Sequence, residues 1–278
     1  MKHKYTALIL LITAVGMIFI ARAWLAAHTA APRTFEIFDI LTVVSAVILL
    51  LKSFRSLRWR DWAAALVLGA VVGAGMLFAT LFSPYPFLGF ITSSAGQAII
   101  RGTFTTLAAL GGLVVMRRGG PVQFHAAAGH WREMSRGILS GLAVGLPLAV
   151  LNVFALKFTQ GQPIQWQSPG AALLDALQPG IVEEVIYRFA LWGLLWLILR
   201  NTFQEKANWL SGLLAMLIHN FTHFDDLFIQ SPLTALGMGA VLALVWGLPP
   251  LLLARRRGLE SAIVFHWIQD MMRFLTGY

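Results

Sequence analysis

The sequence contains no cysteine, few charged residues and no polar stretch long enough for a soluble domain. Of its 278 residues, 12% are charged and 58% are hydrophobic, and the mean hydropathy is +0.73. A soluble domain carries about 25% charged and about 45–50% apolar residues. The composition therefore excludes a soluble globular protein. The missing cysteine also excludes disulfides, a thiolate nucleophile and a cysteine metal site.

Long apolar segments fill most of the chain. A membrane-spanning helix needs about 20 consecutive apolar residues, so the sequence predicts an all-α, polytopic transmembrane bundle of about eight or nine spans. Arg101 and Gly102 interrupt one segment, where we expect a short re-entrant or interfacial piece and one span. The segments are 5–27, 35–51, 61–82, 87–116, 137–158, 172–199, 207–224, 232–253 and 259–275.

The net charge of +9 is explained by topology and not by nucleic-acid binding. Fifteen of the 21 basic residues lie before the first segment or in alternate loops, which is the positive-inside pattern. The opposite loops hold only Arg22, Arg33 and Lys157. We therefore expect a cytoplasmic N-terminus, and we expect the apolar segment after Lys4 to stay as the first span because it has no clear signal-peptide cleavage site.

Three charges lie inside one apolar segment, within the stretch GIVEEVIYRF at 180–189. An ionisable residue at the bilayer centre costs about 2.5–3.5 kcal/mol and usually marks function. Glu184 and Arg188 are four residues apart, so they can form an ion pair within the helix. Glu183 lies about 100° around the helix and shares its face with Tyr187. The spacing thus predicts one neutralised carboxylate and one that is available as a general base.

Histidines gather in the last apolar segments. His219 and His223 share one helix face, and His266 shares another with Asp270. Together with the two glutamates, this set could position a water, bind a divalent metal, relay protons or ligate haem. No HExxH motif is present. We expect either no cofactor or a divalent metal such as zinc, for which Glu183, His219 and His266 offer three ligands and an open position.

These residues resemble the motifs of the CAAX-protease and bacteriocin-processing family of intramembrane endopeptidases, also called CPBP or Abi. The family pattern is EExxxR, then FxxxH, then HxxxN or HxxxD, on separate transmembrane helices. Order and spacing agree, and the resemblance covers about residues 137–275. The matching residues are Glu183, Glu184, Arg188, His219, His266 and Asp270.

The resemblance implies hydrolysis of a peptide bond within the membrane. Glu183 would activate a water with help from His219. His266 would orient or stabilise the tetrahedral oxyanion, and Asp270 would orient His266. Glu184 and Arg188 of the first motif would support this geometry. Hydrolysis also needs a polar cavity, and the residues we expect to line it are Asn220, Thr222, Gln269 and Asp175.

The resemblance divides the chain into residues 1–136, which are transmembrane segments without a motif, and residues 137–278, the catalytic core. The expected partners are a peptide or protein substrate in the membrane and the lipid bilayer, with no nucleic acid. We expect an integral multi-pass protein of a bacterial inner membrane. The span count places Glu183 and His219 nearer the non-cytoplasmic side, which suits exported or membrane-anchored substrates.

One motif position departs from the family pattern. Ala215 stands four residues before His219, where the family usually has phenylalanine, and if His223 were the motif histidine, His219 would take that place. Two other functions stay open. One is a non-catalytic immunity factor or complex subunit on the same scaffold, with a structural polar network. The other is a proton-coupled transporter that uses the Glu/His cluster as a relay, although the sequence shows no inverted repeat.

Overall fold

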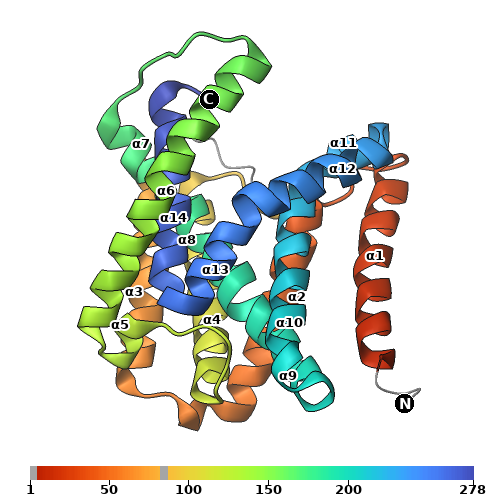
Figure 1. Cartoon of the computed structure of the whole chain (residues 1–278), viewed down its shortest axis with the longest axis vertical. Coiled ribbons are helices and arrows are strands. Elements are labelled where there is room, and N and C mark those ends of the chain that lie inside the picture. The colour runs from red at the N-terminus through yellow and green to blue at the C-terminus, as the bar shows by residue number, and fades with distance from the viewer. Residues whose placement is uncertain (1–4, 82–86) are drawn as a thin grey trace.

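The computed structural model describes residues 5–81 and 87–278, and these residues form helices without any β-strand. The predicted all-α fold is confirmed. The helices pack into one bundle, with the start of α1 at one end and the end of α14 at the other (Figure 1). The elements of the first half are α1 (Thr6–Ala26), α2 (Thr34–Ser53), η1 (Phe54–Ser56), α3 (Trp59–Phe78), α4 (Ser94–Arg117), α5 (His125–Ala128), α6 (Trp131–Gln160) and α7 (Pro169–Asp175).

The second half contains the elements that carry the motifs. They begin with α8 (Leu177–Glu183), which continues without a break into η2 (Glu184–Leu191) and α9 (Trp192–Phe203). The rest are α10 (Glu205–Phe221), η3 (Thr222–Phe224), α11 (Asp225–Gln230), α12 (Pro232–Leu242), η4 (Ala243–Gly247), α13 (Leu248–Arg257) and α14 (Leu259–Thr276).

Six of the described helical stretches are long and apolar enough to cross a membrane. The other three predicted segments, 172–199, 207–224 and 259–275, are also helical and are the ones that hold the motif residues. The expected break at Arg101 is wrong, because α4 runs through it. Gly102 lies there because α4 crosses α3 closely: a Cβ on Gly102 would come within 2.8 Å of the Gly69 carbonyl oxygen. The six spans are Thr6–Ala26, Thr34–Ser56, Trp59–Phe78, Ser94–Arg117, Trp131–Gln160 and Pro232–Arg257.

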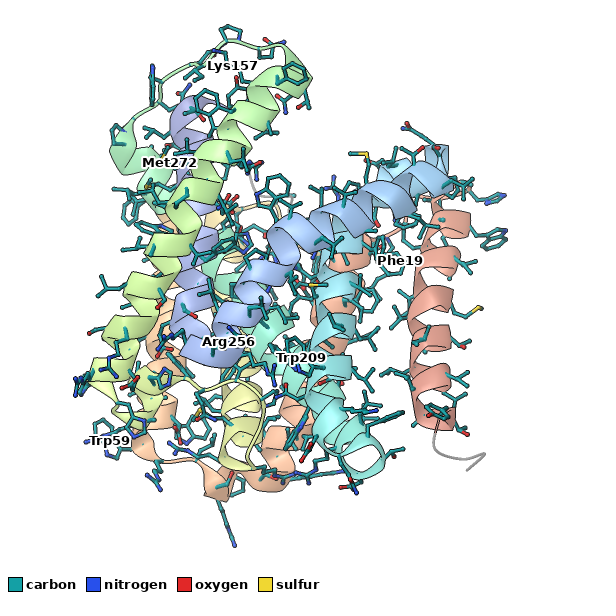
Figure 2. The ribbon with its side chains drawn as sticks, viewed as in Figure 1. Phe19, Trp59, Lys157, Trp209, Arg256 and Met272 are labelled. Atoms are coloured by element: carbon teal, nitrogen blue, oxygen red, sulfur yellow. The ribbon has the colours of Figure 1, made fainter. Side chains whose placement is uncertain are left out.

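Acidic side chains cap the helices of the first half. Glu36 accepts a hydrogen bond from the backbone N–H of Arg33 (2.8 Å) at the start of α2. Asp61 accepts one from the backbone N–H of Arg58 (2.8 Å) at the start of α3, and its other oxygen accepts from the Arg117 Nη2 (2.6 Å) of α4. These bonds satisfy backbone N–H groups that a helix leaves open. The last one also fixes α3 to α4 at the end of the bundle where Trp59 is labelled, opposite Lys157 (Figure 2).

A row of glycines sets the position of α14. Gly137, Gly141 and Gly145 lie four residues apart on α6 and are all buried, the last two against α14 and the first against Arg257 at the end of α13 and Ser261 of α14. Small residues at this spacing let two membrane helices approach closely. The side-chain amide of Gln269 then donates a hydrogen bond to the Gly145 carbonyl oxygen (2.9 Å). The depth and rotation of α14, and therefore of its histidine, are fixed by this contact.

The first motif lies in a π-helical segment at the centre of the bundle. All eight residues of η2 are buried, and η2 packs on α4, α2, α10 and α14. Gly112 of α4 lies against the ring of Phe189, so the large side chain of η2 fits where α4 has none. π-helical turns are rare and frequently mark functional sites. Here the wider turns begin at Glu184, directly after Glu183 at the end of α8, and include Arg188.

Candidate active site

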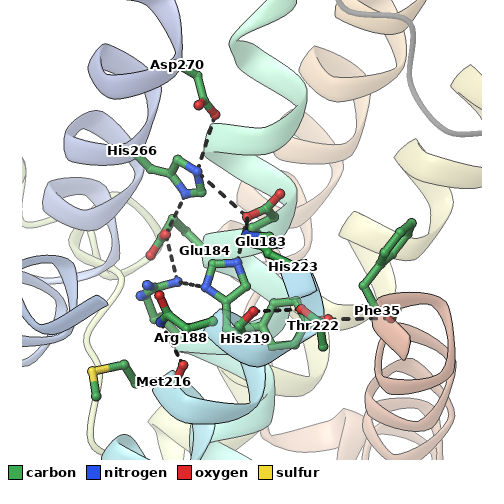
Figure 3. Close-up of polar contacts among 12 residues, drawn as sticks. Phe35, Glu183, Glu184, Arg188, Met216, His219, Thr222, His223, His266 and Asp270 are labelled. Atoms are coloured by element: carbon green, nitrogen blue, oxygen red, sulfur yellow. Dashed lines mark hydrogen bonds and ion pairs between the residues drawn. The ribbon is translucent and has the colours of Figure 1, made fainter. Parts of the chain in front are cut away.

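The carboxylate of Glu183 lies among three histidines (Figure 3). Its Oε2 atom is 2.6 Å from Nε2 of His219, 3.7 Å from Nε2 of His266 and 3.8 Å from Nε2 of His223. His219 lies on α10 and His223 on η3, which follows α10 directly, whereas His266 comes from α14, more than 40 residues later in the chain. The Glu183 side chain is 24% exposed, the highest value among the carboxylates of the two motifs. Of the histidine pair that shares a face, His219 makes the close contact, so it is the motif histidine.

Arg188 determines which nitrogen of His219 carries the hydrogen. Its Nη1 atom lies 2.8 Å from His219 Nδ1, and both side chains are buried. A guanidinium only donates hydrogen bonds, so Nδ1 must accept. The neutral ring therefore carries its hydrogen on Nε2 and donates it to Glu183. This arginine thus orients the hydrogen bond that holds the carboxylate.

Glu184 links the third motif to the first. It is fully buried, and its Oε1 accepts from Arg188 Nη1 (2.9 Å) and from His266 Nδ1 (2.8 Å). The ion pair predicted from the spacing of Glu184 and Arg188 is thus present. The same arginine atom also holds His219, a contact that the spacing did not predict. Glu184 and Glu183 therefore differ in role: one is enclosed by donors, whereas the other faces open space.

His266 lies between three carboxylates. Its Nδ1 faces Glu184, and its Nε2 is 3.3 Å from Asp270 Oδ2 and 3.7 Å from Glu183 Oε2. Both ring nitrogens can donate to these oxygens only as the imidazolium. Asp270 is itself held by Arg273, with 3.0 Å between Oδ1 and Nη1. The arrangement places an oriented positive charge beside Glu183.

Tyr187 supports the back of His219. Its ring stacks on the imidazole, with 4.6 Å between the centroids and 27° between the planes. Its hydroxyl donates to the carbonyl oxygen of Phe35 on α2, at 3.5 Å. The imidazole is therefore fixed on one side by Arg188 and on one face by a buried tyrosine. The ring is thus held at Nδ1 and on one face, and its Nε2 atom points to Glu183.

A cavity of about 790 Å³ opens in front of Glu183. Its rim includes His223 and Asp226, which are exposed. Of the residues predicted to line it, only Thr222 does so. Asn220 and Gln269 line a second cavity of about 280 Å³ on the other side of the histidines. The remaining prediction, Asp175, is wrong: this buried carboxylate accepts hydrogen bonds from the backbone N–H groups of Thr80 (2.8 Å) and Leu81 (2.5 Å) at the end of α3.

The histidines do not offer the lone pairs that the predicted metal site needs. Nδ1 of His219 accepts from Arg188, and its Nε2 carries the hydrogen. Both nitrogens of His266 face carboxylates. The group whose ligand atoms lie within 4.8 Å of one another consists of Glu183, His219 and His223, so it includes His223 in place of His266. Because His219 would have to give up its bond from Arg188 to bind an ion, the hydrogen bonds favour a metal-free carboxylate.

The first half of the chain contributes residues that the sequence analysis missed. Arg22 of α1, Asp39 of α2 and Arg101 of α4 all line the cavity of Glu183. Asp39 and Arg101 form a buried ion pair, with 3.3 Å between Oδ2 and Nη1. Each is a charge in an otherwise apolar segment, which is the signal that marked Glu183. That signal, applied to the whole chain, would have identified all three.

Comparison with known proteins gives one match. Residues 165–272 match the family model described as type II CAAX prenyl endopeptidase Rce1-like. No curated protein and no solved structure gives a significant match to the chain. The matched stretch contains all six predicted site residues and excludes α1 to α6.

Proposed function

Residues 165–272 are similar to the Rce1-like type II CAAX prenyl endopeptidases, and from this similarity we propose that the chain cleaves a membrane-associated peptide with a water activated by Glu183. The observation that carries the proposal is the hydrogen bond of 2.6 Å between His219 and Glu183, with Arg188 fixing the tautomer. It holds one carboxylate oxygen and leaves the other, Oε1, without a hydrogen-bond partner among the described residues.

The reaction begins at this second oxygen. Oε1 of Glu183 takes a proton from a water in the cavity while the water oxygen attacks the carbonyl carbon of the peptide bond. A general base of this kind contributes about 10²–10⁴-fold. The negative charge that develops on the carbonyl oxygen lies beside the imidazolium of His266, which stabilises it. Glu183 then passes its proton to the amide nitrogen, the C–N bond breaks, and an acid and an amine leave.

The charges around Glu183 support this division of roles. Asp270 and Glu184 hold both nitrogens of His266, so its positive charge is present before substrate arrives. A positive charge that is already held in place costs no reorganisation in the transition state. His219 and Tyr187 keep Glu183 in place and close the cavity behind it.

The substrate reaches the site from the end of the bundle where α1 meets α2. The cavity is lined by Arg22 and Arg33, which flank the short loop between those helices. The distribution of lysine and arginine assigns this loop to the non-cytoplasmic side. The proposed substrates are therefore exported, lipidated or membrane-anchored peptides.

The test is Glu183→Gln in the purified protein in detergent, on a panel of lipidated and leader peptides. Glutamine keeps the size and the hydrogen bond from His219 but cannot take a proton. We expect cleavage to fall at least about 100-fold with an unchanged unfolding midpoint. The matched control is Glu205→Gln, which changes an exposed glutamate at the start of α10 and should cleave like wild type.

A chelator separates the glutamate mechanism from a metal one. We expect wild-type cleavage to persist after prolonged treatment with EDTA or 1,10-phenanthroline. Loss of activity that zinc restores would refute the metal-free mechanism. A complementation test adds a second readout. If the Glu183→Gln variant restores the phenotype of cells that lack the protein as well as wild type does, the protein is a non-catalytic subunit on this scaffold and the protease proposal is wrong.

A further inference from the structure

The first helix contributes a single buried residue to the bundle, and that residue is an arginine. All other described residues of α1 are exposed or half-buried, whereas the side chain of Arg22 is 10% exposed. Charged residues in membrane helices face the protein interior and mark function. Here the interior that Arg22 reaches is the cavity of Glu183.

The contacts of Arg22 leave part of its guanidinium without a partner. Its Nε lies 3.4 Å from the Pro32 carbonyl oxygen and 3.5 Å from Asp225 Oδ2. Asp225 is already bound more closely by Thr34, which donates its backbone N–H to Oδ2 (2.8 Å) and its hydroxyl to Oδ1. Nη1 of Arg22 is buried and has no hydrogen bond among the described residues. A buried donor without an acceptor is costly, so this site is suited to an acceptor that arrives with a ligand.

Other contacts hold α1 in position, so the arginine is not its sole attachment. Phe19, one turn before it, points from α1 toward the bundle (Figure 2). Its ring lies 5.7 Å from that of Phe38, 6.3 Å from Phe221 and 5.6 Å from Phe228. This aromatic cluster fastens α1 by apolar contact, which leaves the guanidinium available for another purpose.

A second arginine in the cavity provides a contrast. Arg101 is matched by Asp39 at 3.3 Å, and its guanidinium lies over the ring of Phe87, 4.5 Å from the centroid. Its Nε atom is also buried without a hydrogen bond among the described residues, but its charge is neutralised by Asp39 and its planar face is covered by Phe87. Arg22 differs because its one carboxylate neighbour is at the limit of an ion pair and is engaged by Thr34. Of these two guanidinium groups, Arg22 is the one open to a ligand.

We infer that Arg22 binds the free carboxylate at the C-terminus of the peptide substrate. The inference rests on the proposed function, because the substrate proposed there is a peptide and the anion that every unmodified peptide carries at its end is the C-terminal carboxylate. The planar fork of arginine matches the two oxygens of a carboxylate. A cavity of about 790 Å³ lies within the range of about 300–1,000 Å³ that encloses small ligands. One end of the cavity holds the carboxylate, and the other holds the bond to be cleaved.

The experiment compares two forms of one prenylated peptide, the first with a free C-terminal carboxylate and the second with a carboxamide. We expect wild type to prefer the acid by about 10–100-fold in kcat/KM, the usual value of a hydrogen bond to a charged group, with most of the difference in KM. In Arg22→Gln the preference disappears, because kcat/KM for the acid falls to the value for the amide while kcat/KM for the amide is unchanged. Arg22→Lys keeps the charge without the fork and retains part of the preference.

Two further variants separate recognition from a structural role. If Arg22 only fastened α1 through Asp225, then Arg22→Gln and Asp225→Asn would lower cleavage of both peptides alike and the preference for the acid would remain, which would overturn the inference. We expect Asp225→Asn to keep the preference. Arg55→Gln, at an exposed position after α2, controls for the loss of one positive charge and should match wild type.

The outcomes also distinguish this inference from the proposed function. Equal cleavage of acid and amide by wild type would refute the carboxylate site and leave the protease intact. No cleavage by wild type of these two peptides or of any peptide in the panel would refute the protease assignment, and the inference with it.

Discussion

Replacing Arg188 by methionine should damage both stability and catalysis, through two different partners. Nη1 of Arg188 lies 2.9 Å from Glu184 Oε1 and 2.8 Å from His219 Nδ1, and the arginine and glutamate side chains are almost completely buried. Removing one partner of a buried ion pair leaves an uncompensated charge and costs about 3–5 kcal/mol. His219 also loses the donor that fixes its tautomer. A hydrogen bond to a charged group is worth about 1.5–3 kcal/mol, or about 10–100-fold in rate.

A double mutant separates the two effects. Adding Glu184→Gln to Arg188→Met removes the unpaired charge, so the unfolding midpoint in detergent should recover most of the loss. The rate should not recover, because His219 still lacks its donor. The assay is kcat on the best peptide of the panel beside thermal unfolding of the same preparations. Arg188→Lys is the control, since it keeps the charge but not the fork.

Two results would refute this reasoning. If the double mutant is no more stable than Arg188→Met, the buried charge of Glu184 is not the source of the loss. If Arg188→Met folds and cleaves at the wild-type rate, the tautomer of His219 needs no arginine. Either result would separate the ion pair from the active site.

Two further predictions concern packing and topology. Gly180→Ala should lower the free energy of unfolding by about 1–3 kcal/mol and reduce kcat. The added Cβ would lie 2.9 Å from Cα of Trp267, which is next to the histidine of α14. The control is Gly237→Ala, where an added Cβ would meet nothing within 4 Å. Since the chain has no cysteine, single cysteines report topology. A membrane-impermeant maleimide should label Asp226→Cys but not Arg55→Cys on intact cells, and the reverse pattern would overturn the proposed orientation.

The sequence predicted the fold class and the close approach of the motif residues, and each succeeded for a physical reason. Long apolar segments can satisfy their backbone in a membrane only as helices or closed barrels. Glu184 and Arg188 share a face because helical spacing requires it. An ionisable side chain in a membrane costs free energy unless it has a polar partner. The contacts between Glu183, His219 and His266 follow from this cost.

The cavity could not be predicted from local spacing. Its far wall comes from α1, α2 and α4, which carry no motif and meet the catalytic helices only through tertiary packing. Arg101 was interpreted as a break in a span, although Asp39 neutralises it inside the bundle. Arg22 was assigned to a loop because it lies near the end of an apolar segment. Spacing along one helix says nothing about partners that arrive from another.

The hydrogen bonds of Glu184 have a consequence for how the protein is made. Arg188 neutralises Glu184 within one continuous helix, so of the three charges in this stretch only that of Glu183 enters the membrane without a partner on its own helix. His266, however, is synthesised about 80 residues later and reaches Glu184 only when α14 packs against the glycines of α6. Until then the nascent chain has Glu183 and His219 but no imidazolium beside them. The site that we propose is therefore complete only after α14 has packed against α6 and brought His266 to Glu184.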